Sequence, residues 1–217
     1  MFASFDKNLC FRYNENMFDK VKINSQKESA LAGMLIKTTH QKVLALFLAD
    51  PAKQLYGSEI SKKIRVSVGQ TSKILNDLLR TSVVEKELKG KTELYSLVEL
   101  TPELRLYKTL NTILNIAQLI NELKPASKTI ILYGSCAQGM NTEDSDLDLF
   151  VVSSSRSQVL ASLTLFSPRE KYGYTEIKPV IKSPAEWAGM ETSDPVFFTE
   201  VLKGIVLFKK SVNESRL

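Results

Sequence analysis

Two aspartates, Asp146 and Asp148, stand at the start of a segment that is otherwise hydrophobic from residue 147 to residue 152. Residues two apart on a strand point to the same face, so Asp146 and Asp148 are expected to project together while Leu147 and Leu149 enter a core. Neighbouring carboxylates repel each other unless a cation lies between them, and Mg²⁺ held by carboxylates and substrate phosphates is the usual arrangement. The pair is a candidate metal site, although a solvated strand terminus has the same pattern.

A Gly-Ser pair follows the preceding apolar run, where Gly134 would let a phosphate approach the backbone with no Cβ in the way. Ser135 adds a hydroxyl, and a helix that begins there would direct free N–H groups toward an anion. Taken alone, the pair also fits a simple turn. Its spacing from the aspartates strengthens the functional interpretation: the sequence contains Gly134-Ser135-x-Ala137-x-Gly139, five further residues, and then Ser145-Asp146-x-Asp148-Leu149.

This joint pattern resembles the signature of the polymerase-β-like nucleotidyltransferase superfamily, and most closely that of the minimal nucleotidyltransferases. The resemblance covers roughly residues 126–210. It implies that Gly134 and Ser135 bind nucleotide phosphates and that Asp146 and Asp148 hold Mg²⁺ or Mn²⁺. It also implies an NTP substrate, with ATP expected, whose nucleoside monophosphate passes to a hydroxyl acceptor.

The superfamily usually adds a third carboxylate on a later strand, which acts as a metal ligand or as a base toward the attacking hydroxyl. Glu176 is the candidate for this catalytic and metal-binding role. It also fits an exposed glutamate on an edge strand, because Lys178 lies on the same face and Pro179 is typical of an edge. If Glu176 is misplaced, the site would bind a nucleotide but transfer poorly.

The elements that would position this site alternate between strands and helices, which is typical of an α/β unit. Strands are expected at residues 129–133, 147–152 and 174–181, and a helix at 158–166. Ser183 and Glu186 form a capping box that opens another helix, and a last helix is expected after Asp194-Pro195.

The front part of the chain has a different pattern. Helices are expected from Thr39 to about Asp50, from Ser58 (as the cap) to Ile64 and from Val68 to Thr81, and two β-type runs around Gly90 predict a hairpin. Three short helices and a hairpin resemble a winged helix-turn-helix domain. The resemblance implies that double-stranded DNA meets base-reading residues on the third helix and phosphate-contacting residues on the wing, namely Gln70, Thr71, Lys73, Lys89 and Lys91. A protein-interaction module is the alternative.

A stripe of apolar residues at three- and four-residue steps predicts one helix of about 23 residues between the two parts, from Thr101 to Lys124. The stripe consists of Leu106, Leu110, Ile113, Ala117 and Ile120. It would connect the domains, form a homodimer or pack inside one of them. The fold class is therefore α+β with two domains: a winged helix-turn-helix, a long helix and a nucleotidyltransferase-fold domain with a mixed sheet. The boundaries are residues 39–100, 101–125 and 126–217, and residues 1–38 have no assigned role.

Composition narrows the possible functions of the 217 residues. A single histidine and two cysteines argue against a zinc site, a histidine-based triad and a disulfide framework. No apolar run is long enough for a membrane span, and we expect a cytoplasmic protein. Residues 1–125 contain 19 Lys and Arg against 13 Asp and Glu, whereas residues 126–217 contain 10 against 11. The basic excess is compatible with a phosphate-backbone contact in the front part.

Together these features predict a DNA-binding transcriptional regulator whose second domain binds NTP and Mg²⁺ and transfers a nucleoside monophosphate. The first alternative is a regulator whose nucleotidyltransferase fold serves as a non-catalytic sensor or assembly module. A second is an antitoxin that modifies or neutralises a toxin partner. Transfer to an aminoglycoside is the last alternative.

Overall fold

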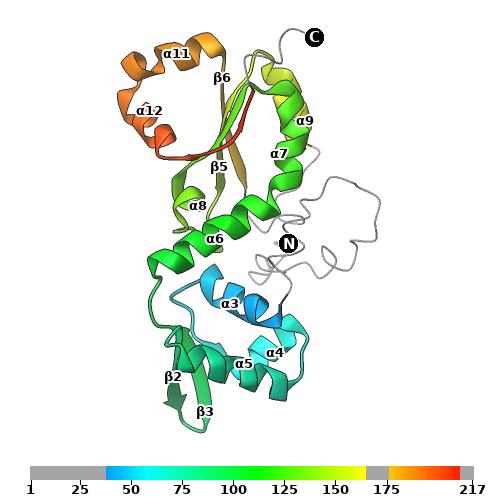
Figure 1. Ribbon diagram of the computed structural model, residues 1–217, viewed down its shortest axis with the longest axis vertical. Coiled ribbons are helices and arrows are strands. Elements are labelled where there is room, and N and C mark those ends of the chain that lie inside the picture. The colour runs from blue at the N-terminus through cyan, green and yellow to red at the C-terminus, as the bar shows by residue number, and fades with distance from the viewer. Residues whose placement is uncertain (1–37, 165–175, 211–217) are drawn as a thin grey trace, which may run out of the picture.

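A computed structural model describes residues 38–164 and 176–210 of the chain. The described residues form two parts that follow each other along an elongated molecule, with helix α6 lying between them (Figure 1). None of the helices in these residues combines the length and the apolar character needed to cross a bilayer.

The front part begins with the three expected helices, α3 (Thr39–Ala49), α4 (Gly57–Ile64) and α5 (Val68–Arg80). Thr38 and Gln41 form a reciprocal capping box at the start of α3, which satisfies backbone donors that a helix end leaves free. Ser58 does not cap α4 as expected, because the helix already begins one residue earlier and Tyr56 occupies the cap position. The helices enclose a hydrophobic core that includes Phe47, Ile60, Ile64, Ile74 and Leu75.

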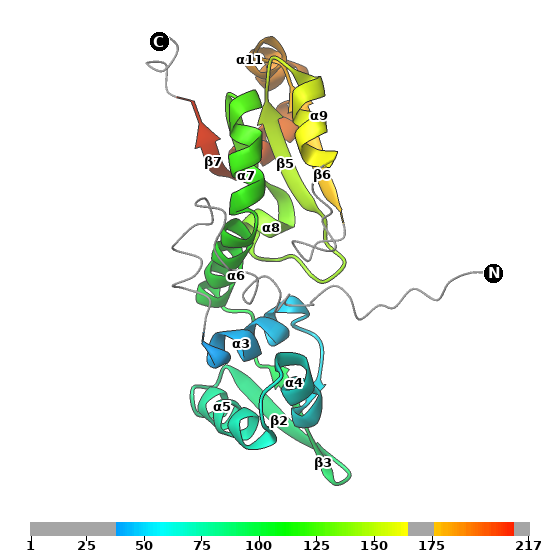
Figure 2. The same cartoon turned by 90° about the vertical axis from the view of Figure 1, so that its right-hand side faces the viewer.

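The hairpin predicted around Gly90 is present as β2 (Val84–Lys89) and β3 (Thr92–Leu97), paired antiparallel. Gly90 has a φ of +67°, a left-handed conformation that glycine adopts without a Cβ penalty. A short strand that the sequence did not suggest, β1 (Leu55–Tyr56), adds to β3 and completes a sheet of order β1-β3-β2. The turn of the hairpin projects away from the rest of the molecule (Figure 2).

The single helix predicted between the two parts is wrong, because the segment breaks at Ile116 into α6 (Pro102–Asn115) and α7 (Ala117–Leu123). Ile116 has φ −92° and ψ 1°, outside the helical region, and its side chain is fully buried. The break lets α7 pack on the sheet of the back part while α6 turns across its end (Figure 1). The apolar stripe divides at the break: in α6 Leu106 is 71% exposed and Leu110 is 36% exposed, whereas Ile120 of α7 is buried.

The back part is built on a mixed four-stranded sheet of order β6-β5-β4-β7. Strands β5 and β6 are parallel, and the other two pairings are antiparallel. The strands are β4 (Thr129–Leu132), β5 (Leu147–Val152), β6 (Ile177–Lys182) and β7 (Ile205–Lys209). The first two expected strands and the mixed character of the sheet are thus confirmed, while β7 was not anticipated and residues 174–175 of the third expected strand lie outside the described residues.

Helices cover both faces of this sheet. Helices α7 and α9 (Arg156–Thr164) lie on one face, and α11 (Pro184–Ser193) and α12 (Pro195–Leu202) lie on the other (Figure 1). The capping box of Ser183 and Glu186 is present at the start of α11. Alternate residues of β5 enter the two cores: Leu149 and Val151 face α7 and α9, whereas Phe150 and Val152 face α11 and α12.

Candidate active site

Gly134 lies where β4 ends and the five-residue helix α8 (Gly134–Gln138) begins. Its φ is +68°, and a Cβ built on it would lie 2.5 Å from Oδ2 of Asp148. No side chain can therefore stand at this position without displacing that carboxylate. The absence of a Cβ lets the Asp148 carboxylate approach the backbone of Gly134 closely, so a ligand held by that backbone would lie beside a carboxylate.

Asp148 belongs to β5 and shares the sheet face of Phe150, with Asp146 two residues before it. The main-chain carbonyl of Asp148 accepts a hydrogen bond of 3.1 Å from the Tyr133 N–H, which holds the ends of β4 and β5 together. Partial burial, and to a lesser degree the negative charge of Asp146, raises the pKa of the Asp148 carboxyl. Two carboxylates are thus held close enough to repel each other at the edge of the Gly134 turn.

The parallel pairing of β5 with β6 brings two further charged residues to the same place. Leu147 is opposite Ile177 and Asp148 is opposite Lys178, so Glu176 immediately precedes this register and its carbonyl accepts a 2.8 Å hydrogen bond from the Leu147 N–H. The Lys178 ammonium lies 2.6 Å from Oδ2 of Asp146. The same carboxylate, with smaller contributions from Glu176 and Asp148, raises the pKa of Lys178.

The expected trio of Asp146, Asp148 and Glu176 is not assembled as a three-carboxylate group. Within residues 38–164 and 176–210, no three Asp, Glu, His or Cys side chains are grouped so that they could hold a metal ion. The Glu176 side chain is exposed, and Asp146 is paired with an ammonium instead. Asp146 and Asp148 nevertheless supply the hard oxygen donors that Mg²⁺ and Mn²⁺ prefer, so these two residues fit a divalent cation.

The family model of the nucleotidyltransferase domain matches residues 113–190, a range that runs from α6 into α11 and contains every residue of this site. This part of the chain is a nucleotidyltransferase domain. Comparison with curated proteins gave no match. Nucleotidyltransferase domains in general use nucleoside triphosphates and divalent metals, which agrees with the open glycine turn beside a carboxylate pair.

Two buried side chains border the site of the nucleotidyltransferase domain. Cys136 is fully buried, and burial raises the pKa of its thiol to about 12. Its Sγ lies 3.3 Å from the carbonyl of Asp146, so it packs against the start of β5, and the protonated thiol is not a nucleophile. Tyr133 is also buried, and its pKa is raised to about 12, first by desolvation and then by Asp148.

Helix α6 holds the opposite side of α8 through polar residues. Lys108 is 6% exposed and donates to the carbonyl of Asn141, and Thr109 Oγ1 donates to the carbonyl of Ala137 at 3.3 Å. Burial lowers the pKa of Lys108 to about 8. Gly139 has a φ of +67°, and a Cβ there would lie 2.2 Å from the main-chain oxygen of Arg105. The backbone of α6 is therefore in direct contact with the backbone at the end of α8. We call this contact, made by Arg105, Lys108 and Thr109 with residues 137–141, the seam between α6 and α8, and the sequence did not indicate it.

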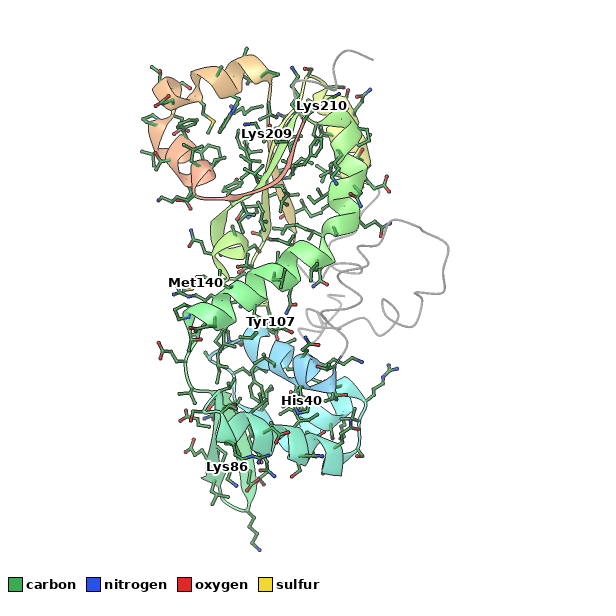
Figure 3. The ribbon with its side chains drawn as sticks, viewed as in Figure 1. His40, Lys86, Tyr107, Met140, Lys209 and Lys210 are labelled. Carbon is green, nitrogen blue, oxygen red and sulfur yellow. The ribbon has the colours of Figure 1, made fainter. Side chains whose placement is uncertain are left out.

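The same helix also reaches the front part. Leu104 and Tyr107 pack against the core of that part, and Tyr107 lies between α6 and α3 whereas Met140 lies at the α8 side (Figure 3). One guanidinium nitrogen of Arg105 contacts Met140 Sδ at 4.0 Å. Helix α6 is thus shared by both parts of the molecule.

The candidate DNA-contacting residues lie on α5 and on the hairpin. All of them are exposed except Thr71. Gln70 and Lys73 are exposed near the start of α5, and Lys89 and Lys91 are exposed on either side of Gly90. Thr71, which was expected to face outward, is 1% exposed and donates its hydroxyl to the Ser67 carbonyl. Its helical position places it against the core, so it is not available to a base edge.

Proposed function

We propose that the nucleotidyltransferase domain binds an NTP, with ATP expected, together with Mg²⁺ or Mn²⁺, and transfers its nucleoside monophosphate to a hydroxyl acceptor. The observation that carries this proposal is the contact between the Gly134 turn and Asp148. A glycine with a φ of +68°, at which a Cβ would displace the Asp148 carboxylate, lies directly beside a carboxylate pair. Phosphates and a divalent cation are the ligands that such a neighbouring arrangement would bind together.

Asp146 and Asp148 would hold the cation, and Gly134 with Ser135 would bind the phosphates. The cation would supply charge neutralisation at the phosphates and polarisation of the reacting phosphoryl group. Gly134 contributes by keeping its backbone clear of a side chain, and the Tyr133 to Asp148 main-chain bond keeps the turn and the carboxylate in register. Glu176 remains the candidate third carboxylate and base, since its backbone adjoins Leu147 at the same sheet end.

The proposal is tested by incubating the purified protein with ATP labelled at the α-phosphate and Mg²⁺. Candidate acceptors are the protein itself, RNA, a partner protein and small hydroxylated molecules. We expect label on one acceptor class and none when the metal is removed with EDTA. Binding of a fluorescent ATP analogue without transfer would favour the non-catalytic sensor. Label on a partner protein would favour the antitoxin interpretation, and label on an aminoglycoside would favour drug modification. If neither binding nor transfer is seen, the proposal is wrong.

A second proposed function is DNA binding by residues 39–100, as a winged helix-turn-helix domain of a transcriptional regulator. Three helices and an antiparallel hairpin with an exposed basic turn support it. Lys86 is neutralised by Glu93 at 2.7 Å, whereas Lys89 and Lys91 form no ion pair within the described residues. Gln70 and Lys73 are the proposed base readers, and the two wing lysines the proposed phosphate contacts.

Helix-turn-helix proteins that recognise specific DNA sequences commonly bind as dimers. The exposed residues Leu106 and Leu110 lie one helical turn apart on α6 and give a second copy of the chain an apolar surface to cover. A homodimer through α6 therefore accompanies the proposed DNA-binding role.

Reversing both wing charges, Lys89→Glu with Lys91→Glu, is expected to weaken DNA binding by at least about tenfold at moderate salt. Each lysine that neutralises a phosphate releases counterions, so losing two such contacts should also reduce the slope of log affinity against log salt by about 2. Fluorescence anisotropy with duplex DNA over a salt series measures both quantities.

The matched control is Lys209→Glu with Lys210→Glu, which changes the net charge by the same amount. These exposed lysines lie at the far end of the molecule from the hairpin (Figure 3). If both double variants lose affinity equally, the effect comes from net charge and the wing assignment is wrong.

A further inference from the structure

Four charged residues lie where β5 and β6 begin. Asp146 and Asp148 come from β5, Glu176 and Lys178 come from β6, and the parallel register sets Asp148 directly opposite Lys178. Residues on adjacent strands of one face are neighbours, and the 2.6 Å contact between Lys178 Nζ and Asp146 Oδ2 runs diagonally across this group. One of the two proposed metal ligands is therefore already occupied by a cation that belongs to the chain.

This ion pair is placed so that it can be exchanged. The Lys178 side chain is 56% exposed and that of Asp146 is 25% exposed, so the pair lies at the solvent boundary and not in the core. An exposed pair of this kind contributes little to stability. The lysine ammonium is a compact charge on a flexible stem of four carbons, so it can move from one oxygen to another within its reach.

A divalent cation and the ammonium compete for the same carboxylate. While Lys178 holds Asp146, the metal would meet a filled ligand position and an adjacent positive charge, both of which oppose its binding. The phosphates of a nucleotide carry several negative oxygens and would give the ammonium an alternative partner. A nucleotide at the Gly134 turn, beside Asp148, would then release Asp146 for the metal.

We propose that Lys178 couples metal binding to nucleotide binding: it pairs with Asp146 in the nucleotide-free site and passes to the nucleotide phosphates when these arrive. This inference rests on the nucleotide-binding role proposed above. It assigns to Lys178 a positioning role that keeps the carboxylate pair from retaining a divalent cation in the absence of substrate. No covalent step is involved, since only ionic partners are exchanged.

The test measures Mn²⁺ affinity by electron paramagnetic resonance, with and without a non-hydrolysable ATP analogue, in the full chain and in Lys178→Gln. In the unaltered protein the analogue is expected to tighten Mn²⁺ binding by at least about tenfold. Lys178→Gln is expected to bind Mn²⁺ alone about tenfold more tightly than the unaltered protein, because its amide neither occupies Asp146 nor repels the ion. The analogue should then add less to Mn²⁺ affinity and should itself bind more weakly.

Two control variants isolate the effect of the charge at this position. Lys178→Arg keeps the charge and should retain weak Mn²⁺ binding in the absence of the analogue. Lys182→Gln removes a lysine from the same strand that pairs with Glu186 at 3.8 Å, and it should leave Mn²⁺ affinity unchanged. Thermal unfolding verifies that all three variants fold, which we expect because Lys178 is exposed and Lys182 is partly exposed.

The outcomes separate this inference from the proposed function. If Lys178→Gln binds Mn²⁺ alone no more tightly than the unaltered protein, the role of Lys178 is wrong, whatever the nucleotide does. If a fluorescent ATP analogue binds none of the proteins, nucleotide binding itself is wrong, and the predicted coupling is overturned with it.

Discussion

Replacing Asp148 by asparagine is expected to lower nucleotide transfer by about 10³-fold, near the upper end of what loss of one preorganised electrostatic group costs. Asparagine keeps the size of the side chain and leaves the main-chain carbonyl that accepts from Tyr133 untouched. What it removes is one of the two negative charges available to a divalent cation. The measurement is the rate of label transfer from α-labelled ATP at saturating Mg²⁺.

The same substitution is expected to raise the melting temperature at neutral pH. Burial and the charge of Asp146 raise the pKa of Asp148 in the folded protein, so folding favours the protonated carboxyl. A raised pKa means that the stability associated with this group is present at acid pH and is lost as pH rises through the folded pKa. Asparagine is neutral at every pH, so its advantage should shrink as the pH is lowered and Asp148 becomes protonated.

Asp144→Asn is the matched control, since it makes the same chemical change on an exposed residue four positions earlier in the chain. It should alter neither transfer nor melting temperature appreciably. If Asp148→Asn transferred label at the rate of the control variant, Asp148 would have no role at the metal site. A fall in melting temperature would show that its charge is compensated in the folded protein.

The core of the site could be predicted from the sequence because it depends on local rules. Strand periodicity of two fixes Asp146 and Asp148 on one face, and β5 has the predicted bounds Leu147–Val152. The glycine requirement at Gly134 also follows from its place between a strand and a small-residue helix. The cap of helix α11 could be predicted in the same way, because Ser183 and Glu186 have the three-residue spacing of a capping box.

The partners of these residues could not be predicted, because they depend on which strands become neighbours. Lys178 was recognised as sharing a face with Glu176, yet only the parallel register of β6 with β5 shows that it reaches Asp146. Strand β7 was missed although the apolar run Ile205–Phe208 follows Gly204, since a short run after a helix fits several structures.

The spacing of apolar residues was the poorest guide to which residues are buried in α6, the helix that contacts both parts of the molecule. In α6 the buried positions include the polar residues Lys108, Thr109 and Thr112, whereas Leu106 is exposed. The reason is the seam with α8, where hydrogen bonds to main-chain carbonyls take the place of apolar packing. Thr71 shows the converse on α5, since a threonine whose hydroxyl bonds within its own helix can be buried at little cost.

The seam between α6 and α8 yields the second large expected effect, which is on stability. Gly139→Ala should lower the free energy of unfolding by about 3 to 4 kcal/mol. A left-handed alanine costs about 1 kcal/mol or somewhat more. The remainder reflects overpacking, since the Cβ would lie 2.2 Å from the Arg105 main-chain oxygen and backbone atoms cannot rotate away. Urea or thermal unfolding measures the loss.

Gly90→Ala separates the two contributions. Gly90 has the same φ of +67° but nothing within 4 Å of its added Cβ, so this variant should show the conformational cost alone, about 1 kcal/mol. The difference between the variants is then the free energy of the α6 to α8 contact. Because Gly139 closes the helix that begins at Gly134, Gly139→Ala should also lower nucleotide transfer, whereas Gly90→Ala should not. Equal destabilisation by both variants would mean that α6 moves away without cost, and the backbone contact would then place no constraint on the nucleotide site.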